Sequence, residues 1–541
     1  MAKTAEKMVS GVAEIGGDAA WKREGVLPVY GAPEGADAMA LSEAARARNG
    51  LVVHIARDGA RAAAMMQALQ FFAPDIPVID YPAWDCLPYD RVSPSGAVAS
   101  RRMAALAAMM RLKGGGAFIL STSVNAAVQR TPPRDIINEA ALTLAPGATM
   151  SMDALTAYLS ANGYARSSTV REAGEFAVRG GLVDIFPPGA DEPVRLDFFG
   201  DSLESVRAFD AASQRTTRQL SRFDLSAASE ILLNEDTVSR FRQGYAKNFG
   251  AAGDDPLYEA ISARRMHAGA EHWLPLFYDA TETLFDFAGD GLVFVDHLAD
   301  EAADARLALI KDHYDARAED AEARRSRNSD FSAPAYRPLK PDALYLSADE
   351  WKARLETLNL RPLSPFAPPE NTRCVNLAAK IGRNFAAERA AEKSNVFDAV
   401  IAHAKTLRES GKTPVIACWS EGSADRMRTV IADHGGGDIA HAADWTAVKN
   451  AKADIVTAVF GLETGFETAG AAFISEQDIL GDRLVRRTRR KRAENFLTEA
   501  SSLSVGDLVV HVEHGIARYE GLKTLEVQGA PHDCLQLVYH G

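Results

Sequence analysis

Residues 51–72 read LVVHIARDGARAAAMMQALQFF. The first six, Leu51–Ala56, form an apolar run typical of a buried strand, and the Ala/Met-rich stretch 60–72 favours a helix. A second and a third strand are expected at 77–81 and 117–121, with a helix over 101–112 between them. Strands that alternate with helices of this length predict a parallel sheet with crossover helices.

The composition is that of an ordinary globular protein with several domains. A chain of 541 residues suggests about three to five domains, and 47% hydrophobic with 25% charged residues disfavours disorder and fibrous classes. The net charge of −13 argues against nonspecific coating of nucleic acid. The four cysteines show no CxxC spacing, which favours a reducing compartment. We find neither a signal peptide nor a membrane span, and therefore expect a cytoplasmic protein without a membrane partner.

The predicted pattern of strands and helices changes several times along the chain. From about residue 145 a small α+β unit follows the first α/β region, and strand and helix patterns return from about 227 to 350. RPLSPFAPPEN at 361–371 predicts a proline-rich linker. Beyond it, helix and strand patterns up to about residue 480 predict a small doubly wound α/β domain, and short strands follow from Val505. The chain stops on a turn signal at Gly541, from which we expect a truncated polypeptide.

No nucleotide-binding motif is complete. The only GK[ST] tripeptide, Gly411–Thr413, lacks the upstream glycine of a phosphate loop and stands after a helix and before a strand, the reverse of the required order. The turn after Leu51–Ala56 has no lysine, and its Asp58 would repel phosphate. Asp296 could hold magnesium at a strand end, but an N-cap role is favoured. His511 and His514 lack further ligands at zinc spacing. We therefore predict no catalytic residue, bound cofactor or metal.

Seven basic residues in ten positions distinguish the segment 483–492. Such a run can contact nucleic-acid phosphate, although a solvated linker helix is the favoured interpretation because no aromatic residues are interleaved. The candidate contact residues are Arg486, Arg487, Arg489, Arg490, Lys491 and Arg492.

A second surface feature lies in the α+β unit. Apolar and polar residues alternate along Val194–Phe199, which places Arg195 and Phe199 on one face of a strand. An exposed aromatic flanked by Arg195 and Arg179 has the composition of a protein-binding hot spot. Alternatively, Phe199 is buried in the core and Arg195 pairs with Asp197, and the pattern alone leaves both possibilities open.

Four blocks of the sequence resemble the N-terminal half of the bacterial transcription-repair-coupling factors (the Mfd family), in the family's order. The first runs from GEFAVRGGLVDIFPPG (174–189) through PVRLDFFGDSLESVRAFDAASQRT (193–216). The others are AGAEHWLPLFYD (268–279), GLETGFETAGAAFISEQDILGDR (461–483) and GDLVVHVEHGIARYEGLKTLEV (506–527).

The resemblance implies a division of the chain into seven segments. A degenerate helicase-like domain similar to that of UvrB is expected in two halves, separated by an inserted α+β domain that binds the damage-recognition ATPase UvrA. The expected segments are 1–140 and 227–350 for the two halves, 141–226 for the insertion, 351–371 for the proline-rich linker, 372–480 for the small α/β domain, 481–501 for the basic linker and 502–541 for a truncated RNA-polymerase-interacting domain.

The family's contact residues come to this chain only by that resemblance. UvrA-binding residues match Arg179, Arg195 and Phe199. The terminal segment resembles a Tudor-like β-barrel that docks on the RNA polymerase β subunit, and its apolar contact maps to Leu525, which an alternating strand could equally place in the barrel's own core. Complete members use ATP and magnesium in two motor domains that translocate on double-stranded DNA. Those motifs do not occur before Gly541, so we expect no ATPase activity and an uncovered UvrA surface.

Two other functions remain as alternatives. A UvrB-like, ATP-dependent excision-repair helicase subunit would need a phosphate loop. A CarD-type regulator would act on RNA polymerase through the terminal segment alone and would leave Arg179 and Phe199 without a role.

Overall fold

The computed structural model describes residues 7–9, 12–14, 17–112, 114–253, 255–326, 336–391, 395–481, 506, 508–511, 515–527 and 530–539. For 7–9, 12–14, 323–326, 510–511, 515, 521–527 and 530–535 this description covers the backbone only. Contacts divide the chain into two compact units, Met1–Gly481 and Asp482–Gly541. Within the described residues no helix combines the length and apolar character needed to cross a membrane.

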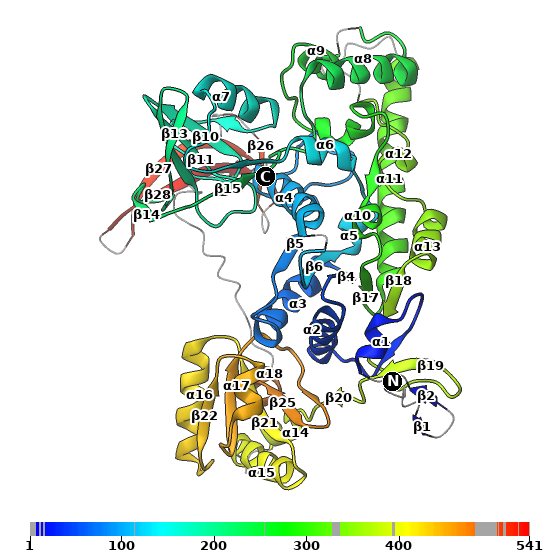
Figure 1. Ribbon diagram of the computed structural model, residues 1–541, viewed down its shortest axis with the longest axis vertical. Coiled ribbons are helices and arrows are strands. Elements are labelled where there is room, and N and C mark those ends of the chain that lie inside the picture. Colours follow the sequence, from blue (N-terminus) through cyan, green and yellow to red (C-terminus); the bar gives the residue numbers. More distant parts are fainter. Residues whose placement is uncertain are drawn as a thin grey trace. The chain divides into compact units, whose positions relative to one another are not determined.

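A five-stranded, fully parallel sheet forms the centre of the first unit (Figure 1). Its order is β18-β17-β4-β6-β5, so strands from both sides of the expected insertion lie in one sheet. The strand and helix pattern predicted around residues 51–121 is confirmed, with α3 and α4 as the crossover helices. The bounds are β4 Leu51–Ala56, α3 Gly59–Phe72, β5 Val78–Tyr81, α4 Gly96–Leu112, β6 Phe118–Ser123, β17 Leu292–Val295 and β18 Asn359–Pro362.

The α+β unit is built on a six-stranded sheet in the order β14-β13-β12-β11-β10-β9. Helix α7 (Met152–Ala161) contributes Leu155 and Leu159 to a core shared with Phe176, Leu196 and other apolar side chains of the sheet. A separate pair, β8 (Leu142–Leu144) and β15 (Phe223–Leu225), joins the beginning of the unit to its end. The sheet strands are β9 Ala165–Arg166, β10 Glu175–Arg179, β11 Leu182–Ile185, β12 Val194–Phe199, β13 Ser202–Phe209 and β14 Thr216–Gln219.

The doubly wound domain predicted after the proline-rich stretch is also present. Its sheet has the order β20-β24-β25-β21-β23-β22, of which the last four strands are parallel. The strands are β20 Lys380–Ile381, β21 Thr413–Cys418, β22 Ile439–Ala442, β23 Ile455–Val459, β24 Phe466–Glu467 and β25 Ala471–Ser475; the helices include α15 Val396–Glu409, α16 Glu421–Asp433, α17 Trp445–Asn450 and α18 Glu476–Leu480.

One hydrophobic core joins this domain to the first sheet. Phe71 of α3 stacks on Phe460 with ring centroids 4.6 Å apart, and Phe72 contacts Trp445 at 5.7 Å. Gly35 lies so close that a Cβ there would meet the Phe466 ring at 2.6 Å.

The expected linker 351–371 therefore does not separate two compact units. It contains the end of α13 (Ala348–Glu356) and the whole of β18, an edge strand, where Pro362 is tolerated. Two further strands, β3 (Val29–Tyr30) and β19 (Arg373–Asn376), pair across it in parallel.

The second unit contains an antiparallel three-stranded sheet, in the order β26-β27-β28. The strands are β26 Leu508–His511, β27 Gly515–Val527 and β28 Ala530–Tyr539.

Candidate functional site

Three adjacent strands of the inserted unit, β10, β11 and β12, bring the sequence-predicted contact residues to one face of a sheet. In the antiparallel register Arg179 lies opposite Leu182, Leu182 opposite Asp197, and Arg195 opposite Asp184. Residues directly opposite one another share a face, and side chains two apart on a strand do so as well. The structure therefore places Arg179, Arg195 and Phe199 on the face opposite the α7 core.

Phe199 is the most exposed large hydrophobic side chain among the described residues, with 79% of its surface accessible. Its neighbour Phe198 is buried, so the alternation predicted for β12 is confirmed and the alternative with Phe199 in the core is wrong. A phenyl ring held at the end of a strand in water offers a large apolar area to a partner.

Arg195 is held in place by Asp184 of the neighbouring strand β11. Its Nε donates to Asp184 Oδ1 at 2.7 Å and its Nη2 to Oδ2 at 2.9 Å. The guanidinium carbon lies 4.6 Å from the centroid of the buried Phe209 ring. The hydrogen bond that Arg195 donates to Asp184 is the main cause that raises the pKa of Arg195. Pairing of Arg195 with Asp197 is therefore wrong, and Asp197 instead contacts Arg207 at 3.3 Å.

Arg179 is exposed and is tethered by neutral acceptors. Its Nη2 donates to the Ser168 carbonyl at 2.7 Å and to Thr169 Oγ1 at 3.0 Å. The turn that follows contains Gly181, whose carbonyl accepts a hydrogen bond from the Phe198 backbone N–H at 2.9 Å. This bond joins the end of β10 to the end of β12, where Phe199 lies.

A second candidate site is a cavity of about 390 Å³ between the first sheet and the small α/β domain. In each sheet, the parallel strands that follow along the chain are added first on one side of one strand and then on its other side. That strand is β4 in the first sheet and β21 in the second. Ligands of open α/β sheets bind at the carboxyl ends of strands at such switch points. Arg57 and Asp296 line the cavity from one sheet, and Trp419 and Gly461 line it from the other.

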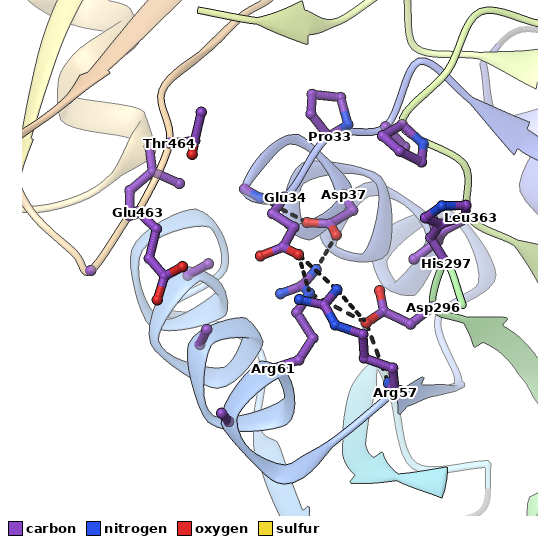
Figure 2. A pocket seen from close by; sticks show the side chains of 18 of the residues that line it. Pro33, Glu34, Asp37, Arg57, Arg61, Asp296, His297, Leu363, Glu463 and Thr464 are labelled. Atoms are coloured by element: carbon purple, nitrogen blue, oxygen red, sulfur yellow. Dashed lines mark hydrogen bonds and ion pairs between the residues drawn. The ribbon is translucent and has the colours of Figure 1, made fainter. Parts of the chain in front are cut away.

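The turn between β4 and α3 stands where a phosphate loop would bind, but its helix is capped from within. Asp58 accepts a hydrogen bond from the Arg61 backbone N–H at 2.8 Å. Arg61 is almost fully buried, and its guanidinium contacts Asp37 and, at 3.4 Å, Asp296 (Figure 2). Arg57 donates to Glu34 at 2.7 Å. Both arginines of this turn are therefore engaged by carboxylates of the chain.

The cavity is acidic overall, since five carboxylates and two guanidinium groups line it. Burial raises the pKa of Asp37, while Arg61 opposes that rise. Burial would also raise the pKa of Asp296, but the neighbouring His54, 3.9 Å away, and the charge of Arg61 lower it. The Asp296 carboxylate contacts Arg57, Arg61 and His54, so its contacts are with the β4 turn and not the helix cap that the sequence favours.

The Gly411–Thr413 tripeptide has the arrangement that the sequence predicts. It connects the end of α15 to β21, and Lys412 Nζ forms an ion pair with Glu467 Oε2 at 2.7 Å. Within the part of the chain that the structure describes, no group of three or more His, Cys, Asp or Glu residues is placed to hold a metal ion.

The remaining predicted contacts belong to the second unit. Leu525 lies in β27 opposite His532 of β28, and its side chain is not described. The basic candidates Arg486, Arg487, Arg489, Arg490, Lys491 and Arg492 lie outside the described residues.

The structure brings to these sites several residues that the sequence did not indicate. Asp184 is a charged residue inside the apolar strand LVDI, which is the signal that could have identified it as a buried partner. Nothing in the local sequence around Asp37 or Trp419 indicates that either lines a cavity formed by two distant segments.

Two family models match the chain. The model described as UvrB interaction domain matches residues 142–231, and the model described as CarD-like/TRCF RID domain matches residues 503–541. The first match contains the face with Arg179, Arg195 and Phe199, and it begins at the β8 strand that closes the inserted unit.

Curated relatives share similarity over most of this chain. A transcription-repair-coupling factor of Rickettsia bellii is 31% identical over 479 residues, which is 88% of this chain and 40% of that protein. The factor from Myxococcus xanthus is 31% identical and covers 86% of this chain, and that from Escherichia coli is 29% identical and covers 92%. The chain spans about two fifths of the length of these relatives. The resemblance seen in the four sequence blocks is therefore confirmed, and this chain is a relative, over most of its own length, of the transcription-repair-coupling factors.

Proposed function

We propose that this chain is the adaptor portion of a protein for transcription-coupled nucleotide excision repair. It recruits UvrA through the inserted domain and contacts the RNA polymerase β subunit through residues 502–541. The observation that supports the first contact best is the 79% exposed Phe199 on the same sheet face as Arg179 and Arg195, within the match to the UvrB interaction domain.

The rest of the domain plan is proposed on the same basis. Residues 1–140 and 227–350 are the halves of a UvrB-like domain, and the terminal segment is part of a Tudor-like β-barrel. ATP and magnesium are used by the motor domains of the complete family members, and double-stranded DNA is bound mainly through those domains, with the basic run 486–492 as a possible further contact.

The UvrA contact is tested by replacing Phe199 with Ala and measuring UvrA affinity by titration calorimetry. Truncation of a hot-spot residue typically costs at least about 2 kcal/mol, or roughly thirtyfold in affinity. Phe366→Ala is the matched control, because Phe366 is also exposed, at 64%, and lies outside the 142–231 match. Equal UvrA affinity of the two variants would contradict the proposal.

The polymerase contact is tested by Leu525→Arg, which places a charge at the proposed apolar contact. We expect loss of β-subunit binding with unchanged UvrA binding, because Leu525 and Phe199 belong to different compact units. Unchanged polymerase binding would exclude Leu525 from the contact.

Each alternative function has its own discriminating measurement. Binding of ATP by this chain would favour a UvrB-like helicase subunit over an adaptor. If the chain is a CarD-type regulator, the double substitution Arg179→Ala and Phe199→Ala should leave its affinity for UvrA unchanged.

A further inference from the structure

The three candidate UvrA-contacting side chains are held in different ways. Phe199 is free in water, and Arg179 is exposed and donates only to neutral oxygens. Arg195 is the exception, because its side chain is only 17% accessible and donates through two nitrogens to a carboxylate that is 3% accessible.

The contact between Arg195 and Asp184 is specific in geometry. Two parallel N–H donors match the two oxygens of one carboxylate, an arrangement that sets both the position and the plane of the guanidinium group. The buried Phe209 ring, whose centroid lies 4.6 Å from the guanidinium carbon, holds the guanidinium group in this orientation from the core side. The neighbouring pair on this face, Arg207 and Asp197, has a single contact of 3.3 Å between side chains that are 35% and 45% accessible.

The Arg195 guanidinium retains donors for a partner. Of its five N–H bonds, Asp184 uses one on Nε and one on Nη2, and the Gln214 carbonyl lies 3.5 Å from Nη1. An unsupported arginine loses rotamer freedom when it is immobilised at an interface, which costs about 0.5–1.5 kcal/mol. Arg195 is already immobilised before a partner arrives.

We infer that Asp184 is a positioning residue of the UvrA-binding surface: it does not contact the partner, but it orients Arg195 so that the remaining N–H donors face outward. This inference rests on the proposed function of the inserted domain. It assigns a role to a residue that neither the resemblance nor the sequence pattern singled out.

The test is a double-mutant cycle on UvrA affinity, measured with the whole chain by titration calorimetry. Asp184→Asn removes the charge and one acceptor at nearly constant volume, and we expect UvrA affinity to fall about tenfold. Asp224→Asn is the matched control, since it neutralises an acid of the inserted unit that pairs with Arg111 at 3.1 Å and lies outside the six-stranded sheet, and it should change affinity less than twofold. In an Arg195→Ala background, Asp184→Asn should cause no further loss.

Three outcomes overturn the inference while the proposed function stands. They are an unchanged affinity of Asp184→Asn, an equal loss from Asp184→Asn in the presence and absence of Arg195, and an Arg195→Ala variant that binds like the wild type. Absence of UvrA binding by the wild-type chain itself would refute the proposed function first and would be recognised before any variant is compared.

A second variant keeps the test decisive if Asp184→Asn does not fold. Arg195→Lys retains the positive charge beside Asp184 but cannot make the two-pronged contact. We expect a comparable, roughly tenfold weakening of UvrA binding with little change in melting temperature. Wild-type affinity of Arg195→Lys would show that charge alone suffices, and the positioning role of Asp184 would be abandoned.

Discussion

The carboxylate of Asp58 accepts a hydrogen bond of 2.8 Å from the backbone N–H of Arg61, in the first turn of α3. In a phosphate loop, N–H groups of this turn point at the ligand, because a helix N-terminus attracts anions. Here the same position holds an acid of the chain, and the Arg61 side chain is engaged by Asp37 and Asp296. An acid of the chain and an ion-pair network therefore occupy the position where a phosphate loop would hold its ligand.

Loss of this cap should destabilise the fold without creating a nucleotide site. We expect Asp58→Ala to lower the free energy of unfolding by about 1 kcal/mol, measured by urea denaturation, and Asp58→Ser to retain most of the stability. Titration calorimetry with Mg-ATP should detect no binding to the wild type or to either variant. Micromolar ATP affinity in any of them would contradict the proposed lack of a nucleotide site.

Phe460 should be essential to the shared core of the first sheet and the small α/β domain. Its ring is 4% accessible and stacks on Phe71 at 4.6 Å, so Phe460→Ala should cost about 3–5 kcal/mol. Phe366→Ala, at an exposed position, should change stability by less than about 0.5 kcal/mol. Urea unfolding followed by tryptophan fluorescence, to which all six tryptophans contribute from within residues 1–481, and by circular dichroism should give coincident transitions. Separate transitions would show that the first sheet and the small α/β domain unfold independently.

Glu230 should anchor the segment that returns from the inserted unit. It forms a fully buried ion pair with Arg102 at 3.0 Å and accepts a hydrogen bond from Trp84 Nε1 at 2.5 Å. Removal of one member of a buried pair leaves an uncompensated charge, so we expect Glu230→Gln to cost about 3–5 kcal/mol.

The adjacent arginine provides a control for that measurement. Arg101 pairs with Asp80, and their side chains are 49% and 28% accessible. Asp80→Asn should therefore cost less than about 1 kcal/mol in the same denaturation assay. If Asp80→Asn and Glu230→Gln lower the free energy of unfolding by similar amounts, the burial of the ion pair between Arg102 and Glu230 does not make it more important for stability than an exposed pair.

His272 should make the fold sensitive to acid. Burial lowers the pKa of His272 to about 4, and neither ring nitrogen has a hydrogen-bond partner in the structure. Between pH 6.5, near the ordinary value, and pH 4 the unfolded chain binds a proton that the folded chain does not. The free energy of unfolding should therefore decrease as the pH is lowered from 6.5 to 4, by at most about 1.4 kcal/mol per pH unit.

The comparison of wild type with His272→Phe isolates this contribution. The phenyl ring keeps the contacts with Trp84 and Tyr89 but does not titrate. Denaturation at pH 7 and pH 5 should show a smaller loss for the variant than for the wild type, and an equal loss would exclude His272 as the cause.

Local patterns in the sequence predicted much of the fold. Strand β4, helix α3 and the alternation along β12 follow from hydrophobic periodicity, because each depends on neighbours within one or two turns of chain. Short strands carry a weaker signal: β22 has only four residues, and β18 contains a proline and lies within the predicted linker. The shared core of Phe71 and Phe460 was not predicted, since no periodicity relates side chains almost four hundred residues apart.

The candidate surface shows the same limit. The pattern placed Phe199 and Arg195 on one face, but it could not identify the acid that pairs with Arg195. Asp197 lies two residues along the same strand, whereas Asp184 lies on a neighbouring strand whose register the sequence does not show. The observed register decides in favour of Asp184. The family resemblance supplied the residues, and the tertiary structure supplied the way in which they are held.

The antiparallel pairing of Leu142 with Leu225 has a consequence for how such a protein can be assembled in evolution or in the laboratory. The first and last residues of the segment between Leu142 and Leu225 lie side by side. If this segment is removed or exchanged, a short turn can therefore span the gap. The inserted module, together with the sheet face that carries Phe199, can therefore be moved to another host protein without changing the order of strands in the host's sheets.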